Sequence, residues 1–365
     1  MAARRHTVVV TGERWRAPGA LLRILREEAG LDLATVAPAG VGESGAAFWV
    51  TDHAGTVSLL KIMPGPAAAA LAELRALDLM VNRLRDRGYP AARLTALGRT
   101  AAFGFWIQQR LPGRPLDRSP GFPDLSRLAT LLPELIRLND LQAGLATGAA
   151  GWPALLVRTL TEGGDGYCLH ATLAARPDTR DLLRAVRDIG ARCGPAIPPG
   201  TDFMHYDFAP TNLLTDAATI TGVIDINAPV LPGDRAFDLA TLLFYVYDHD
   251  GIRARLGARL LELAGDHAAR AYLAHIVLRQ VEWSVRHYPA AAATRRHLRL
   301  ARQVITDIAS TAPPWQGSLC RGWTSDDIRT SWLDQRRQTR AVGGRPGRRI
   351  CPRNHSSPGP RPVSS

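Results

Sequence analysis

The spacing of apolar residues divides the chain into a strand-rich first part and a helix-rich second part. Four apolar runs have the length of strands: residues 46–50, 56–62, 93–98 and 103–109. A helix is predicted over residues 67–86, where apolar side chains recur at helical spacing: Leu71, Leu74, Leu77 and Val81. From residue 124 onward the pattern is mainly helical, interrupted by strands within residues 203–227. This order predicts an α+β fold with a small β-rich lobe followed by a larger, mainly helical lobe.

Length and composition set the expected domain organisation. The chain has 365 residues, of which 46% are apolar, so it can bury a sizeable core, and its length predicts about two domains. We place an N-terminal lobe at residues 1–110, a C-terminal lobe at residues 111–312 and a tail at residues 313–365. The tail is rich in Arg, Pro and Gly and lacks periodic apolar spacing, so it is predicted to be disordered.

The basic charge of the chain is concentrated in this tail. The formal net charge is +12, and the ten arginines and three aspartates of the tail give +7 of it. A basic arm that touches nucleic acid or a membrane predicts salt-dependent binding that is lost on truncation after Pro313. We favour a solvated extension, and therefore expect no nucleic-acid partner and no membrane contact. Four arginines of a late helix are likewise expected to form a solvated face: Arg295, Arg296, Arg299 and Arg302.

The apolar runs and the cysteines bear on the cellular compartment. The first ten residues contain an apolar run of only three valines, and no stretch approaches the ~20 apolar residues that cross a bilayer. The four cysteines form no C-x-x-C pair, so we expect neither disulfides nor zinc: Cys168, Cys193, Cys320 and Cys351. A cytoplasmic protein is predicted.

The segment from His205 to Asn212, followed by a short apolar strand that ends at Asp225, carries the most chemical information. A carboxylate at the tip of a loop can aim a hydroxyl and take its proton, and Asp207 is the candidate for this catalytic role. Mg²⁺ takes only one or two protein ligands beside the phosphates that it binds. Asn212, five residues after Asp207, and Asp225 have the spacing for this metal-binding pair. The pattern indicates ATP-dependent phosphoryl transfer.

A single His-x-Asp pair also occurs by chance, mostly in turns and helix caps. The chance interpretation loses weight because a further motif, Gly233–Ala240, follows the strand. We predict that Asp234 caps a helix beginning near Ala236 and that Asp238 holds the backbone of the catalytic loop, with His205 as further support. A buried carboxylate without a partner is costly, so both aspartates should be paired.

Lys61 is the only lysine beside 44 arginines. It lies in an apolar run, residues 57–62, that is predicted to be a buried strand, where an ammonium needs a partner. Kinases place a strand lysine against the α- and β-phosphates of ATP. The alternative is a lysine on an edge strand that extends its ammonium into solvent.

The expected partner of Lys61 is an acid on the next helix. Glu73, 12 residues after Lys61 and one turn into the helix, is the first choice for the ion pair. Asp78 is the alternative, and either acid could instead be a solvated surface residue.

A glycine-rich segment, Gly40–Gly45, precedes the first predicted strand. Its G-x-G-x-x-G pattern is weak alone, but a dinucleotide-binding version would open a helix, whereas a strand follows here. A glycine loop between strands can drape its N–H groups over phosphates, together with the Ser44 hydroxyl. The residues assigned to this loop are Gly40, Gly42, Ser44 and Gly45. A plain hairpin turn remains the alternative.

The order of these motifs resembles the aminoglycoside phosphotransferase and choline kinase-like family, within the protein kinase-like fold. The resemblance covers roughly residues 20–310. It implies a two-lobed kinase that binds Mg·ATP between its lobes, with Asp207 as catalytic base and Asn212 and Asp225 as metal ligands. Residues 107–113, with Gln109, resemble the family's hinge, where backbone groups meet the adenine.

Three positions depart from the pattern of the family. Family members often carry Gly after the loop histidine and Trp after the metal-binding aspartate, where this chain has Tyr206 and Ile226. Ala209 also stands where many relatives have His. No predicted ligand is lost, but the departures leave the substrate subgroup open.

The acceptor side is defined only by candidate carboxylates. Amine-rich antibiotics need clustered acids near the reacting hydroxyl, and Asp248, Asp250 and Glu282 are the candidates. Tyr245, Tyr247 and Trp283 could form an aromatic pocket, although at helical spacing they are also typical of a core. We therefore predict a kinase for a hydroxylated small molecule, such as an aminoglycoside or a metabolite. A nucleotide-binding pseudoenzyme with a scaffolding role is the alternative.

Overall fold

The computed structural model describes residues 17–40, 46–64, 67–145, 151–216, 219–228 and 231–309. The chain divides into two compact units, Met1–Leu319 and Cys320–Ser365, and all described residues belong to the first. The predictions made for Gly42, Ser44 and Gly45, and for the tail, lie outside the described residues. The lobe boundary near residue 110 stays a prediction.

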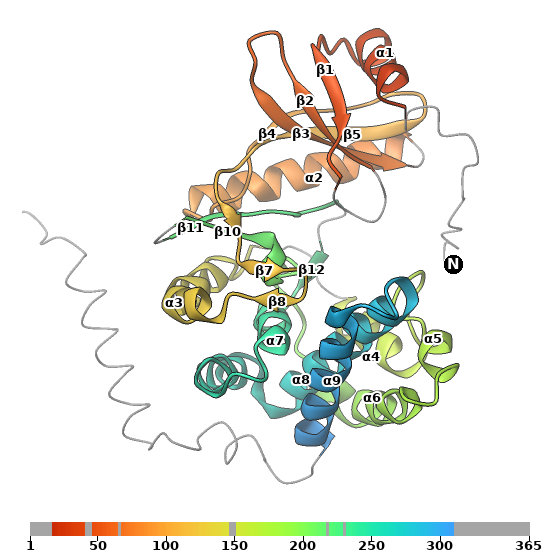
Figure 1. The fold of residues 1–365 in the computed structure, drawn as a ribbon, viewed down its shortest axis with the longest axis vertical. Coiled ribbons are helices and arrows are strands. Elements are labelled where there is room, and N and C mark those ends of the chain that lie inside the picture. Colours follow the sequence, from red (N-terminus) through yellow and green to blue (C-terminus); the bar gives the residue numbers. More distant parts are fainter. Residues whose placement is uncertain are drawn as a thin grey trace, which may run out of the picture. The chain divides into compact units, whose positions relative to one another are not determined.

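A five-stranded antiparallel sheet forms the first part of the chain, with the strand order β1-β2-β3-β5-β4 (Figure 1). Its elements are α1 (Pro18–Ala29), β1 (Thr35–Pro38), β2 (Ala47–Thr51), β3 (Val57–Pro64), α2 (Ala67–Asp86), β4 (Leu94–Arg99) and β5 (Phe103–Gln109). Helix α2 packs on β4 and β5, and the approach is close: a Cβ at Gly104 would lie 2.7 Å from that of Ala70. The predicted strands and helix are all present, whereas α1 and β1 had not been predicted.

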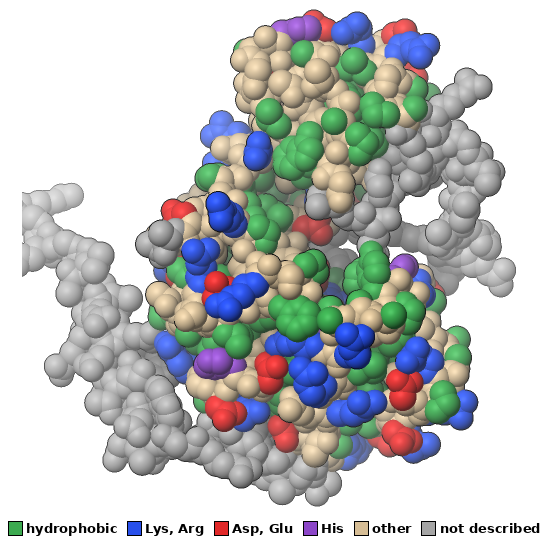
Figure 2. All heavy atoms as spheres, in the orientation of Figure 1, with side chains coloured by type: hydrophobic (Ala, Val, Ile, Leu, Met, Phe, Trp, Pro, Cys, Tyr) green, Lys and Arg blue, Asp and Glu red, His purple; other side chains and the backbone are tan. Residues whose placement is uncertain are grey.

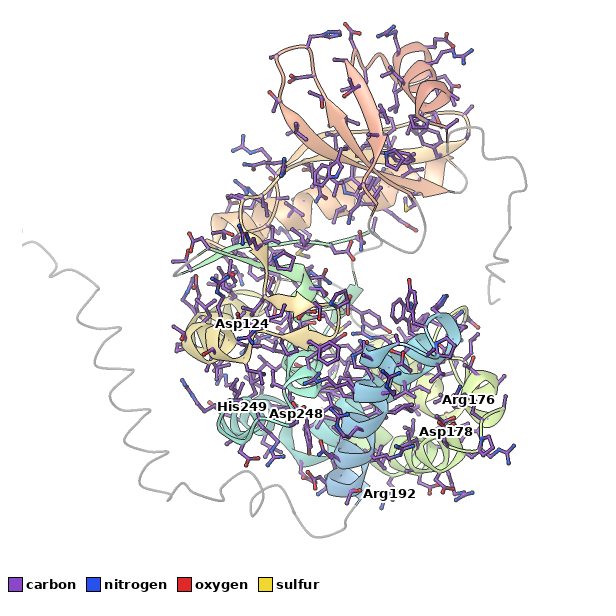
Figure 3. The ribbon with its side chains drawn as sticks, viewed as in Figure 1. Asp124, Arg176, Asp178, Arg192, Asp248 and His249 are labelled. Carbon is purple, nitrogen blue, oxygen red and sulfur yellow. The ribbon has the colours of Figure 1, made fainter. Side chains whose placement is uncertain are left out.

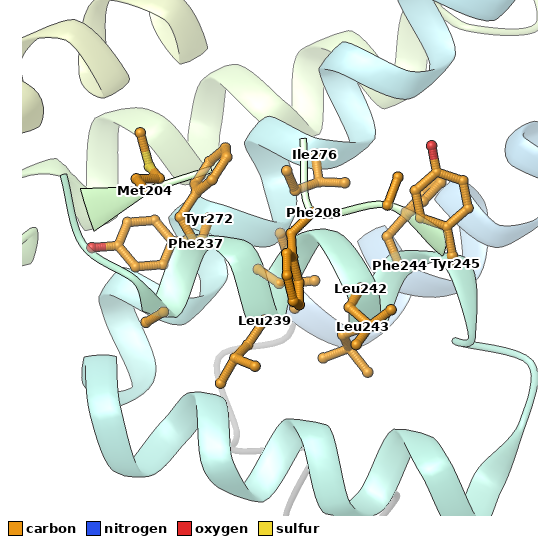
Figure 4. Close-up of a cluster of buried hydrophobic side chains, with 14 of the residues drawn as sticks. Met204, Phe208, Phe237, Leu239, Leu242, Leu243, Phe244, Tyr245, Tyr272 and Ile276 are labelled. Atoms are coloured by element: carbon orange, nitrogen blue, oxygen red, sulfur yellow. The ribbon is translucent and has the colours of Figure 1, made fainter. Parts of the chain in front are cut away.

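Helices dominate the rest of the chain, as predicted. They are α3 (Leu125–Leu141), α4 (Trp152–Thr161), α5 (His170–Ala174), α6 (Arg180–Cys193), α7 (Ala236–Tyr245), α8 (Asp250–His287) and α9 (Ala292–Ala309). Every residue of α7 is buried, and this helix packs on α8, which bends at Gly265. Figure 4 shows the apolar cluster around α7, which includes Phe208 together with Phe237 and Tyr272.

Short strands lie between the helices, and two of them flank residues 205–212, the loop that the sequence predicts to be catalytic. They are β6 (Arg114–Pro115), β7 (Asp117–Ser119), β8 (Phe122–Pro123), β9 (Asp202–Met204), β10 (Leu213–Thr215), β11 (Ile220–Val223) and β12 (Leu231–Gly233). Strand β10 pairs with β11 and β6, and β9 pairs with β12. The fold is therefore α+β, with a sheet-rich first part and a helical second part.

The helical part mixes charges of both signs on its surface, as the visible face in Figure 2 shows. One expectation for it is wrong: Arg296 is buried, with 5% of its surface exposed, and is not part of a solvated face. Its guanidinium donates to the carbonyls of Gly121 and Tyr245 and to the carboxylate of Asp248. These acceptors compensate the cost of burying the charge. Among the described helices, none has the length and apolar content needed to span a membrane.

Two buried histidines predict how stability responds to acid. Burial lowers the pKa of His297 to about 4 and that of His275 to about 3, and the neighbouring Arg296 and Arg279, respectively, add to the effect. The unfolded chain takes up these protons near pH 6.5, whereas the folded chain does not, so stability is lost as the pH falls below 6.5.

His297→Gln tests this expectation. Without the buried imidazole, acidification from pH 7 to pH 5 should cost about 2 kcal/mol less of unfolding free energy than in the unmodified protein. Urea unfolding at both pH values measures the difference. His267→Gln, the same substitution at an exposed position of α8, is the control. Equal acid sensitivity in the two variants would contradict the assignment.

Candidate active site

A hairpin brings Asn212 next to the segment that ends at Asp225. Strands β10 and β11 pair with Leu213 opposite Val223, and the N–H of Ile224 donates to the carbonyl of Asn212 at 2.9 Å. Each predicted metal ligand therefore flanks the same end of one hairpin. Their proximity follows from the short hairpin, since only two short strands and a turn separate them.

Asp238 fixes the backbone of the catalytic loop. Its carboxylate accepts hydrogen bonds from the N–H groups of His205 (2.8 Å) and Tyr206 (2.9 Å) and from the side-chain amide of Gln142 (2.9 Å). Burial raises the pKa of Asp238 to about 6, although the charge of His205 and these donors oppose the rise. This is the contact that was expected for Asp238 from the sequence.

His205 and Asp234 support the same region. The Nε2 atom of His205 lies 2.8 Å from the carbonyl oxygen of Ile224, so it acts as the donor and links the loop to the end of β11. Asp234 accepts from the N–H of Ala236 (2.8 Å) at the start of α7 and from the Tyr272 hydroxyl (2.7 Å). Burial raises the pKa of Asp234 despite these donors.

Asp207 lies at the tip of the loop with its carboxylate held by two donors. The Asn212 amide nitrogen donates to its Oδ2 atom at 3.1 Å and to its main-chain carbonyl at 2.9 Å. On the other side, Nη2 of Arg279 donates to Oδ1 at 3.1 Å. The side chain keeps 46% of its surface exposed. Asp207 is thus both aimed by neighbours and open to a ligand.

Lys61 lies on β3, in the middle of the sheet, paired across Ala47 and Trp106. The edge-strand alternative is therefore wrong. Its Nζ atom is 2.6 Å from Oδ1 of Asp225 and 2.8 Å from the side-chain oxygen of Asn227. Burial opposes ionisation of Asp225, but the ammonium and Asn227 lower its pKa below the usual value. Asp225 is thus a carboxylate at neutral pH.

The expected ion pair between Lys61 and Glu73 is not formed, and this prediction is corrected. Within the described residues, the ammonium has Asp225 and Asn227 as its oxygen partners instead. Glu73 is partly buried on α2, and Asp78 of the same helix accepts from Asn82. The reason is geometric: Asp225 follows β11, and the hairpin places its carboxylate against the Nζ atom of Lys61.

The other residues assigned to the nucleotide stay predictions. Gly40, the first residue of the glycine-rich segment, has a φ of +68°, the left-handed conformation that favours glycine. Gln109 is exposed at the end of β5, and its N–H donates to the carbonyl of Arg93.

The three acids proposed for the acceptor each bind an arginine. Glu282 is fully buried and contacts Arg286 at 2.8 Å, with the Thr172 hydroxyl as a further donor. Asp248, labelled in Figure 3 beside His249 at the start of α8, binds Arg296 at 2.8 Å. The third acid, Asp250, is exposed and contacts Arg253. These carboxylates are already neutralised, which weakens the expectation of an anionic pocket for an amine-rich acceptor.

Replacing Lys61 with methionine tests whether this lysine serves the nucleotide or the fold. Methionine keeps the apolar part of the side chain on β3 and removes the ammonium. We expect the KM for ATP to rise about 10-fold or more, by loss of a charge-assisted contact to phosphate, with little change in melting temperature. Kinetics and thermal unfolding measure the two effects. A collapse in stability with unchanged KM would indicate a structural role instead.

Comparison with known proteins identifies the family. The profile of the phosphotransferase enzyme family, APH, matches residues 35–274. No curated protein sequence matches the chain significantly. A solved structure of a thermostable mutant of aminoglycoside phosphotransferase APH(4)-Ia, a ternary complex with ADP and hygromycin B, aligns over 80% of this chain and 99% of its own, with 17% identity and a TM-score of 0.55.

Two further structures are similar at lower TM-scores. Aminoglycoside phosphotransferase APH(3'')-Id from Streptomyces rimosus has 20% identity and a TM-score of 0.47, over 71% of this chain and 97% of its own. A putative fructosamine-3-kinase from Thermobifida fusca has 19% identity and a TM-score of 0.49, over 80% and 100%. Since the profile match covers more than half of the sequence, the chain belongs to the APH phosphotransferase enzyme family and has its protein kinase-like fold.

Proposed function

We propose that this protein is an ATP- and Mg²⁺-dependent kinase that transfers the γ-phosphate to a hydroxyl of a small molecule. One observation carries the proposal: Lys61 of β3 meets a distant segment that holds Asp207, Asn212 and Asp225, and direct hydrogen bonds and backbone pairing link these residues at one place. Phosphoryl transfer needs such a base, metal-binding oxygens and a phosphate-binding cation together.

In this proposal Asp207 acts on the acceptor. Its exposed carboxylate would take the hydroxyl proton as the new oxygen–phosphorus bond forms and the bond to the ADP oxygen breaks. The ammonium of Lys61 would bind the phosphates as a compact point charge. Its strand, β3, is held in place by β2 on one side and β5 on the other.

The available oxygens fit a Mg²⁺ ion. The Asn212 amide nitrogen is committed to Asp207, which leaves its oxygen for a cation, and Asp225 uses one carboxylate oxygen on Lys61. Within the described residues no group of three or more His, Cys, Asp or Glu could hold a metal alone. Two protein ligands suit Mg²⁺, which shares its coordination with phosphates and water. Bound there, the ion would neutralise charge on the phosphates.

The acceptor is proposed only as a hydroxylated small molecule. Hygromycin B in the APH(4)-Ia complex is an example of such a molecule bound by a family member. The arginine partners of Glu282, Asp248 and Asp250 argue for including acceptors without clustered amines, such as homoserine, beside aminoglycosides. A cytoplasmic location, with its supply of ATP, suits this function.

Transfer of the γ-phosphate from Mg·ATP tests the proposal. The acceptor panel comprises aminoglycosides, other hydroxylated antibiotics, homoserine and choline, each run beside Asp207→Asn. Transfer to any acceptor that disappears in the variant supports a small-molecule kinase and names its substrate class. Mg²⁺-dependent ATP binding with no transfer to any acceptor, and no hydrolysis, would favour the pseudoenzyme.

A further inference from the structure

A buried arginine of α8, Arg279, contacts the catalytic loop at two points. Its Nη2 atom donates to Oδ1 of Asp207 at 3.1 Å, and its Nη1 atom donates to the carbonyl of Tyr206. Only 9% of its surface is exposed. No sequence pattern marks this residue, since it is one of 44 arginines.

Two aromatic rings hold the guanidinium in place. It lies 4.7 Å from the centroid of the Tyr206 ring and 5.9 Å from that of Phe237. The two rings are themselves stacked, with centroids 5.3 Å apart and planes at 12°. Such cation–π contacts strengthen when water is excluded. Burial opposes the charged form of Arg279, but Asp207 and Tyr206 raise its pKa above the usual value, so it stays charged.

The backbone of the loop explains why two anchors are needed. Tyr206 has a φ of +71°, a left-handed conformation that is unfavourable for a residue with a Cβ atom. Asp238 binds the N–H of Tyr206 and Arg279 binds its carbonyl, so both ends of the residue are held. The turn that places Asp207 thus depends on a carboxylate on one side and a guanidinium on the other.

We infer that Arg279 is a positioning residue for Asp207. It holds one carboxylate oxygen while Asn212 holds the other, which stops rotation of the carboxylate and leaves it aimed at the acceptor hydroxyl. Arg279 transfers no proton and touches no substrate; it acts through the placement of the base. This inference rests on the proposed kinase function, because a fixed base matters only for proton removal.

Arg279→Met is the test, with Arg270→Met as the matched control. Arg270 is also a buried arginine of α8 that binds a carboxylate, Asp266, and a backbone carbonyl, that of Ile308, but it is not part of the site. We expect Arg279→Met to lower kcat about 10- to 100-fold, the effect of a base displaced by about 1 Å, with a KM for ATP within about 3-fold of the unmodified value. Arg270→Met should lower the melting temperature without a change in kcat of the folded fraction.

Two further variants separate positioning from general stability. Arg279→Lys keeps the charge and should recover part of kcat. In an Asp207→Asn background, Arg279→Met should cause no further loss of rate, because a residue that acts only through Asp207 has nothing left to position. Unchanged kcat in Arg279→Met, or an equal loss with and without the Asp207 carboxylate, would overturn the inference.

Amide hydrogen exchange gives a readout that does not need an acceptor. Peptides covering residues 205–212 should exchange faster in Arg279→Met than in Arg270→Met at equal global stability. If the protein neither transfers nor hydrolyses phosphate, the proposed function fails, while exchange still decides whether Arg279 holds the loop. Equal exchange in both variants would refute the placement role whatever the activity.

Discussion

Asp207→Asn is expected to lower the rate of phosphoryl transfer by about 100- to 10,000-fold, the range that a general base contributes. The variant keeps the size of the side chain and removes the group that takes the proton. The affinity for Mg·ATP should change by less than about 3-fold, because Lys61 and Asp225 are untouched. Steady-state kinetics with an acceptor from the panel, and binding of Mg·ATP followed by thermal shift, measure the two quantities.

The contacts of Asp207 add a second expectation for this variant. Both of its carboxylate oxygens accept, one from Asn212 and one from Arg279. An asparagine amide must turn its NH₂ group toward one of these donors, so the variant loses one hydrogen-bond acceptor in either orientation. We expect a loss of about 1–3 kcal/mol in unfolding free energy.

A control variant must therefore remove a hydrogen-bond acceptor of the same kind and leave Asp207 unchanged. Asp178→Asn does so, because the two carboxylate oxygens of Asp178 each accept a hydrogen bond from the guanidinium of Arg176, at 3.1 and 3.0 Å, and its side chain is 40% exposed, close to the 46% of Asp207. It should lose stability and keep kcat. If Asp207→Asn retained more than about a third of the rate in its folded fraction, Asp207 would not be the base.

The parts of the site that the sequence predicted are those built by neighbours along the chain. Asn212 meets Asp207 across one loop, and the short hairpin from β10 to β11 returns the chain to Asp225. The motif after it places Asp238 on the first turn of α7, where it reaches the backbone of the loop. Local spacing suffices for such contacts, because a turn or a hairpin allows few arrangements.

The parts that were missed depend on distant pairings. Lys61 and Asp225 are 164 positions apart, and choosing Glu73 as the partner rested on its place on the next helix, which says nothing about the hairpin. Arg279 lies 72 positions after Asp207. In a chain with so many arginines, composition carries no signal for a single functional one.

The abundance of arginine also explains why the acids predicted to bind the phosphoryl acceptor have partners within the protein. The acids that the sequence offered as contacts for the substrate are bound by arginines, from another helix in the case of Asp248 and Arg296 and from the same helix in the cases of Asp250 and Glu282. A guanidinium offers several donors and so can bind a carboxylate and backbone carbonyls at once. Counting acids along a sequence therefore overestimates the negative charge that a ligand meets.

Replacing Asp225 should remove Mg²⁺-dependent nucleotide binding. The expected loss is about 100-fold or more in affinity for Mg·ATP, since mutation of groups behind a metal ligand already costs 10- to 100-fold. Asp225 has a φ of +67°, so alanine adds backbone strain, whereas asparagine tolerates this conformation. Asp225→Asn thus isolates the charge, and Asp225→Ala adds the loss of both oxygens.

The dependence on Mg²⁺ separates a metal ligand from a partner of Lys61. ATP affinity should be measured for both variants over a Mg²⁺ titration and with the metal chelated. A metal ligand predicts a large difference from the unmodified protein at saturating Mg²⁺ and a small one without the metal. Asp225 also neutralises Lys61, so losing only that role would free the ammonium and raise the affinity for metal-free ATP. Full Mg·ATP affinity in Asp225→Asn would refute its assignment as a ligand.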